Sequence, residues 1–157
     1  MERSELEDDE PPTRTALAAH EAGHAVAAWA LGRRVERVWI DSGGGTEVRN
    51  TKALPLIDQV AIGRAGAYAT ELLGIPAPTW MARKDREKVL FEILTGLPHD
   101  EGVYHVQQGG DRAYDLLEAN KTMLTRLADV LEQAGTLDHA EIMKIANEYG
   151  EKVFTTA

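Results

Sequence analysis

Two histidines four positions apart, with a glutamate directly after the first, form the run His20-Glu21-Ala22-Gly23-His24. The surrounding segment is apolar and rich in alanine, which predicts a helix. Residues four apart lie on one face of a helix, so both imidazoles can bind one zinc ion. Glu21 lies on the adjoining turn, where its carboxylate can reach a water on that ion. The run therefore predicts a zinc hydrolase.

The alternative interpretation is that the two histidines only pack in a core. That arrangement is costly, because two imidazoles and a carboxylate on an apolar helix surface need polar partners when they are buried. Gly23 also leaves room beside a metal ion. We therefore favour His20 and His24 as metal ligands.

A catalytic zinc ion needs a third protein ligand and an open fourth position. The chain has no cysteine, so the third ligand must be a histidine or an acid. His99 and His105 flank a predicted glycine-bearing loop, whereas His139 falls in the first turn of the last predicted helix and is expected to be solvated. Asp111 follows Gly109-Gly110 at the start of a predicted helix, where it could equally be a plain N-cap. The residue pattern alone leaves these candidates open.

The size and charge of the chain limit the classes of function. At 157 residues one domain is expected, and the net charge of −9 argues against nucleic-acid binding. Six acids and one base in residues 1–10 predict a disordered acidic tail over 1–12, followed by one domain over 13–157. The chain has no apolar run of the roughly 20 residues that a membrane span requires, and its N-terminus does not resemble a signal peptide. A cytoplasmic location is expected.

Periodicity and turn residues predict a mainly α fold with a small β element near the helix that carries the histidines. Helices are expected over 13–31, 55–73, 79–94, 110–133 and 138–149, strands over 35–40 and 46–50, and a loop over 95–109. Segment 61–67 is rich in small residues and segment 79–94 is amphipathic. Both are candidate surfaces for homo-oligomer formation, although such faces more commonly pack inside one chain.

Several segments resemble the peptidase domain of the FtsH-type ATP-dependent zinc proteases. Residues 13–26, TRTALAAHEAGHAV, look like the start of that domain, and residues 63–74, GRAGAYATELLG, resemble its helix that ends in glycine. Gly109-Gly110-Asp111 resembles the segment that carries an aspartate ligand, and residues 127–142 are similar to the closing helix–turn–helix. The resemblance runs in the right order over roughly residues 13–150.

By this resemblance, His20, His24 and Asp111 would bind Zn2+ and Glu21 would be the general base. Glu71 occupies the place of an acid near the family's site, although an ordinary surface glutamate is equally expected there. The implied fold is a zincin-like helical metallopeptidase domain with a small β-hairpin or short sheet. The separation of 87 residues between His24 and Asp111 is long for the family pattern, and 75–109 would hold the extra length.

The implied activity is that of a zinc-dependent endopeptidase that acts on unfolded or flexible protein segments. The alternative is a non-catalytic zincin-like domain that binds a protein partner. Family members usually carry an ATPase module and membrane helices before this domain, and neither is present in this chain. We therefore expect an ATP-independent peptidase, or one that receives its substrate from a partner ATPase or adaptor. A strand at 35–40 or 46–50 could be an edge that pairs with extended substrate, or could serve only in structural pairing.

Overall fold

The computed structural model describes residues 10–151, which form a mainly α domain with a small antiparallel sheet. The predicted fold class is confirmed. Most of the predicted acidic tail, residues 1–9, lies outside the described residues. The α-helices are α2 Arg14–Ala30, α3 Leu56–Leu72, α4 Thr79–Lys88, α5 His99–Ala119, α6 Lys121–Ala134 and α7 His139–Tyr149. The strands are β1 Val35–Trp39, β2 Gly45–Val48 and β3 Thr136–Asp138, and the short turns are η1 Asp41–Gly43, η2 Thr51–Ala53 and the π-helical η3 Val89–Ile93.

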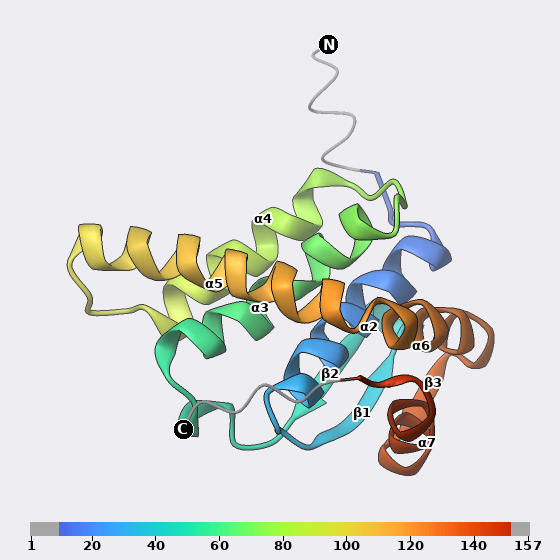
Figure 1. Cartoon of the computed structure of the whole chain (residues 1–157). Helices are drawn as coiled ribbons and strands as arrows, with labels where there is room; N and C mark the ends of the chain where they lie inside the picture. The colour runs from blue at the N-terminus through green and yellow to red at the C-terminus, as the bar shows by residue number, and fades with distance from the viewer. Residues whose placement is uncertain (1–9, 152–157) are drawn as a thin grey trace.

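Helix α2 lies at the centre of the domain and contacts α3, α5, α6, β1 and β2 (Figure 1). Its first turn is capped by Thr13, whose hydroxyl oxygen accepts a hydrogen bond from the Ala16 amide. It stops at Leu31, followed by Gly32 with φ of 77°. Both ends therefore follow the prediction. Alanines occupy most of the buried positions of α2, so neighbouring helices can approach it closely from several sides.

Helices α2 and α3 cross at glycines. A β-carbon on Gly23 would lie 2.5 Å from the Ala69 Cβ and 2.8 Å from the Ala65 carbonyl oxygen. A β-carbon on Gly66 would lie 2.5 Å from Cε1 of His20. The small-residue segment 61–67 therefore packs inside the domain against α2, which fits the packing interpretation and not the self-association one.

The sheet has the order β2-β1-β3, and β1 pairs antiparallel with both neighbours. Val38 lies opposite Thr46 on one side and Leu137 on the other. The two predicted strands are confirmed with slightly different ends, whereas β3 was not predicted because its three residues are too few to show a period. Trp39 is half-buried and packs across the strand pair against Gly45.

The predicted loop over 95–109 and the single helix over 110–133 are wrong. The chain forms α5 from His99 and α6 to Ala134, with a break at Asn120. The glycines at 109 and 110 suggested a loop, but their physical role is helix packing. A β-carbon on Gly109 would lie 2.3 Å from Val60, and one on Gly110 would lie 2.5 Å from the Tyr68 hydroxyl.

Two other helices agree well with their predicted ranges. Segment 79–94 is helical, with its last turn widened into the π-helical η3, where the Leu94 amide donates to the Val89 carbonyl. Helix α7 begins with the predicted capping box, in which Asp138 and Glu141 bond reciprocally to each other's backbone amides. None of the helices in residues 10–151 is long and apolar enough to cross a membrane.

The close contact between α2 and α3 predicts a strong difference between two glycine substitutions. We expect Gly23→Ala to lower the free energy of unfolding by about 1–3 kcal/mol, because the added methyl group overlaps α3 backbone. In Gly102→Ala, in α5, the added β-carbon has no neighbour within 4 Å. This substitution should leave the free energy of unfolding unchanged or raise it by about 0.5–1 kcal/mol. Urea unfolding followed by circular dichroism measures both, and equal effects would contradict a tight crossing.

Candidate metal site

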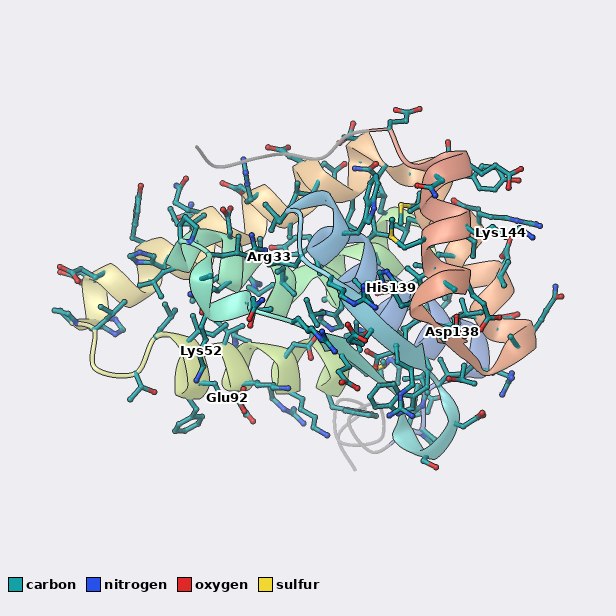
Figure 2. The ribbon with its side chains drawn as sticks, turned by 90° about the horizontal axis from the view of Figure 1, so that it is seen from below. Arg33, Lys52, Glu92, Asp138, His139 and Lys144 are labelled. Atoms are coloured by element: carbon teal, nitrogen blue, oxygen red, sulfur yellow. The ribbon has the colours of Figure 1, made fainter. Side chains whose placement is uncertain are left out.

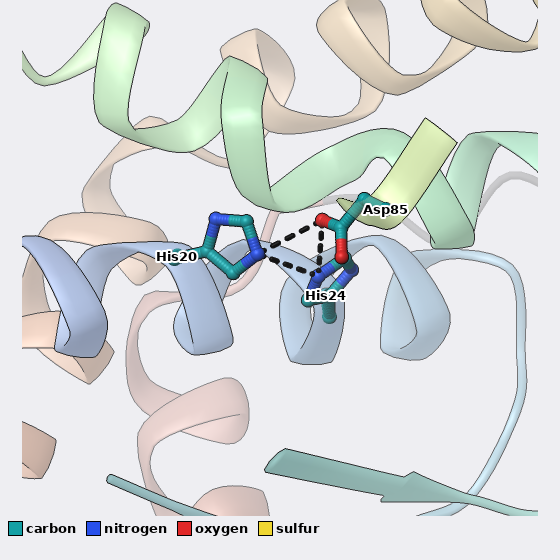
Figure 3. Close-up of side chains that lie close together, drawn as sticks. All are labelled: His20, His24 and Asp85. Carbon is teal, nitrogen blue, oxygen red and sulfur yellow. Dashed lines mark hydrogen bonds and ion pairs between the residues drawn. The ribbon is translucent and has the colours of Figure 1, made fainter. Parts of the chain in front are cut away.

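Three side chains converge between α2 and α4 (Figure 3). Oδ2 of Asp85 lies 2.8 Å from Nε2 of His20 and 3.1 Å from Nε2 of His24. The two Nε2 atoms are 3.2 Å apart. The side chains are largely buried, with 6%, 13% and 18% of the surface of His20, His24 and Asp85 exposed. Three potential ligand atoms thus face one point.

The two histidines are held by contacts with α3. The ring of His20 lies against Gly66, where no side chain intervenes. Nδ1 of His24 lies 2.7 Å from the Ile62 carbonyl oxygen. Because a carbonyl only accepts, Nδ1 must carry the proton when it makes this bond, which leaves Nε2 free to bind a metal.

Asp85 was not among the predicted site residues. It lies on α4, one turn after Met81 and one turn before Val89, both of which are buried. A usable signal was therefore present in the sequence, because Asp85 places a charge on the apolar stripe of an amphipathic helix. Nothing in the sequence alone showed that this stripe faces the histidines.

The cluster is strongly coupled electrostatically. Burial lowers the pKa of His24, but the charge and hydrogen bond of Asp85 and the charge of Glu21 outweigh it and raise that pKa to about 9. Burial raises the pKa of Asp85, but the two histidines outweigh this and hold it well below its usual value. In metal-free protein at neutral pH, His24 and Asp85 therefore form a buried ion pair.

The donor atoms fit a tetrahedral zinc ion. Bonds of about 2.0–2.1 Å from such an ion place its ligand atoms about 3.3 Å apart, and the three observed separations are 2.8, 3.1 and 3.2 Å. Two imidazoles and one carboxylate are also a donor set that zinc prefers. Oδ2 of Asp85 is buried and lies within 3.1 Å of both Nε2 atoms, so a cation at this point would take the place of the proton that His24 carries in the metal-free protein.

Glu21 lies beside this cluster in a cleft of about 470 Å³. Its Oε1 accepts a hydrogen bond from the Thr46 hydroxyl, 3.2 Å away, and the same hydroxyl lies 3.1 Å from the Glu21 carbonyl oxygen. Thr46 belongs to β2, whose residues line the cleft. The hydrogen bonds fix the carboxylate of Glu21 between the edge of the sheet and the histidines.

Asp111, the predicted third ligand, is not brought to the histidines. It lies well inside α5, not at a helix start, and is exposed. It lines a second cavity of about 650 Å³, with Arg64, Tyr68 and apolar residues of η3 and α5. The glycines before it act in packing, so the N-cap interpretation also fails.

The other candidates lie outside the cluster too. His99 lines the same second cavity, and Nδ1 of His105 bonds the Glu101 carbonyl oxygen within α5. His139 is half-buried, not solvated as expected, and its Nδ1 lies 2.9 Å from the Val35 carbonyl oxygen. Glu71 is exposed and does not line the cleft. Within residues 10–151, Asp85 is the acid that joins the histidines.

A family model, described as Peptidase M50B-like, matches residues 10–97. This is more than half of the chain, and it contains His20, Glu21, His24 and Asp85 but ends before Asp111. The chain belongs to the Peptidase M50B-like family. No curated protein matches the sequence.

Membership of the Peptidase M50B-like family confirms the broader prediction of a metallopeptidase-type protein. The FtsH-type assignment is finer than this match and stays a prediction. A metallopeptidase family implies a metal ion, and the cluster of His20, His24 and Asp85 is the potential site for it in this Peptidase M50B-like domain.

The geometry predicts that metal binding depends on Asp85 and not on Asp111. We expect Asp85→Asn to weaken zinc binding by at least about a hundredfold, because it removes an anionic ligand and not merely a supporting group. Asp111→Asn changes the same atoms at an exposed site and is the matched control, expected within twofold of wild type. Zinc affinity is measured by competition with a chromogenic chelator. If Asp111→Asn weakened zinc binding and Asp85→Asn did not, Asp111 would be the third ligand, as the sequence analysis predicted.

The raised pKa of His24 predicts how the stability of metal-free protein changes with pH. Since its folded pKa is about 9 and its ordinary value is 6.5, the stabilisation is complete below pH 6.5 and is lost as pH rises through 9. We expect the free energy of unfolding in a chelator to fall by about 1–3 kcal/mol over this range. Asp85→Asn should abolish the fall. A wild-type profile that stays flat between pH 6.5 and 9 would contradict the ion pair.

Proposed function

We propose that this domain is a zinc-dependent endopeptidase that hydrolyses peptide bonds in unfolded or flexible protein segments. The observation that carries the proposal is the triangle of donor atoms from His20, His24 and Asp85 with Glu21 beside it in one cleft. The family match supports the broader class, a metallopeptidase. The metal, the roles of the residues and the substrate are the proposed parts.

His20, His24 and Asp85 would hold the zinc ion, with the proton of His24 leaving Nε2 as the ion binds. When bound, zinc supplies Lewis acidity, which polarises a scissile carbonyl group and lowers the pKa of water toward neutrality. Glu21 is then the general base. It accepts a proton from the attacking water and passes it to the leaving amine nitrogen. Its hydrogen bond from Thr46 positions the carboxylate for both transfers.

The position of strand β2 supports the proposal that the substrate is an extended peptide. In the sheet of the described residues it is an edge strand, paired with β1 alone, and residues 43–46 together with Val48 line the cleft. A peptide in extended conformation could pair with this edge and place its carbonyl groups beside the histidines. Backbone pairing favours no particular side chain, and it requires a segment that is not already folded. A partner ATPase or adaptor would be needed only to unfold stable substrates.

The role of Glu21 predicts a variant that binds metal but does not hydrolyse. We expect Glu21→Gln to keep zinc affinity within a few-fold of wild type, since it preserves the shape of the side chain. Cleavage of casein should fall by about 10²–10⁴-fold because the general base is lost. Gel electrophoresis of casein digests, with zinc-loaded wild type and variant at equal concentration, measures this.

Glu118→Gln is the control for this experiment, because Glu118 is exposed on α5 and does not line the cleft. It should leave cleavage unchanged. Equal cleavage by wild type and Glu21→Gln would overturn the mechanism. Zinc binding without any cleavage by wild type would favour the alternative function, a domain that binds a protein partner.

A further inference from the structure

Outside the proposed metal site, the charged side chains in the cleft have a net positive charge, opposite in sign to the net charge of the whole chain. The chain carries a net charge of −9. Apart from Glu21 and the proposed metal ligands, the charged residues that line the cleft are Lys52, Lys84, Lys88 and Glu92, which sum to +2. Among the described residues none of the three lysines is held in an ion pair, and all are exposed. Their charges are therefore available to a ligand.

The three lysines lie at different points along the cleft. Helix α4 starts at one end with Trp80 and Met81, passes Asp85 in the middle, and reaches Lys88 before η3. On the opposite wall, Leu17 lies near Gly44, whereas Lys52 follows β2 and its carbonyl oxygen accepts from Gln59. Lys84 precedes Asp85 along α4 and Lys88 follows it, so lysines flank the proposed metal site on both sides.

The end of the cleft near η3 is lined by elements that come from two parts of the chain. Lys52 lies on η2, and Lys88 and Glu92 lie on the last turn of α4 and on η3. Figure 2 shows Lys52 and Glu92 on the same side of the domain, and both line the cleft. Lys144 lies far from them on α7.

We propose that Lys52, Lys84 and Lys88 select peptide segments that carry aspartate or glutamate near the scissile bond. The inference rests on the proposed function, whose substrate it narrows from any flexible segment to an acidic one. Lysines on two walls of a cleft raise the local positive potential, and the low-dielectric walls focus it on a chain lying between them.

The spacing of the residues sets where the acids should lie. Asp85 and Lys88 are three residues apart on α4, a rise of about 4.5 Å along the helix. An extended peptide advances about 3.3 Å per residue, so this distance corresponds to about one to two residues. Acidic side chains are therefore expected one or two positions from the scissile bond.

Binding of peptides to zinc-loaded Glu21→Gln tests the proposal without hydrolysis. The probes are two fluorescein-labelled, glycine- and serine-rich peptides of twelve residues that differ only in carrying three glutamates or three lysines. We expect the glutamate peptide to bind about three- to tenfold more tightly, the range for a few exposed charge pairs, and the difference to shrink at high salt. The net charge of −9 on the whole chain would by itself favour the lysine peptide, so a glutamate preference must come from local positive charge.

Charge reversal then locates the effect. Lys52→Glu with Lys88→Glu, in the Glu21→Gln background, should abolish or invert the preference, whereas Lys144→Glu should leave it unchanged. Equal affinity for both peptides, or a preference that persists in the double reversal, would overturn the proposal. Failure of the proposed function has a different signature, since casein would then remain uncleaved whatever the peptides bind.

Discussion

The close crossing of α2 and α3 is the constraint on which the rest of the site depends. It exists because Gly23 and Gly66 have no side chains at the contact, where even a methyl group would come within 2.5 Å of a neighbouring atom. Close approach brings the ring of His20 onto the backbone of α3 and lets His24 reach the Ile62 carbonyl oxygen. Both imidazoles are then fixed by backbone, which moves less than side chains do. A wider crossing would leave both rings free to rotate.

The third member of the cluster is positioned by a separate set of contacts. Val60 of α3, Val89 of η3 and Leu94 form a small core cluster of their own, apart from the main core around α2. This cluster holds the end of α4 against α3, so that Asp85 faces the histidines one turn earlier. Burying a carboxylate there costs free energy, which its interaction with protonated His24 offsets in the metal-free protein. A divalent cation would offset the same cost more fully.

The sequence is enough to predict the helix that carries His20 and His24, but not that Asp85 on α4 lies beside them. The spacing of His20 and His24 needs only the period of one helix, and Thr13 and Gly32 mark its ends, so those predictions depend on local structure. Asp85 is 61 residues beyond His24, and its position depends on how α4 packs, which no local pattern reveals. The choice of Asp111 followed from treating Gly109 and Gly110 as loop residues. In the structure the same glycines are interior positions of α5, where α3 comes too close for a side chain. A glycine in a sequence can therefore mark either a loop or a close contact between helices, and only the tertiary structure distinguishes the two.

The part of the chain beyond the family match contributes no ligand atom to the cluster, yet the site requires it physically. Helix α2 consists largely of alanine on its buried faces, so it has little apolar surface of its own with which to hold its place. The large side chains come from α5 and α6, where Leu116, Leu124 and Leu127 are buried in the core that includes α2. Each such side chain contributes about 1.5–3 kcal/mol when fully buried. Small residues at the centre permit the close crossing, and large residues from later in the chain supply the free energy that maintains it. Substitutions in α5 or α6 would therefore loosen the cluster of His20, His24 and Asp85, although none of these residues touches it.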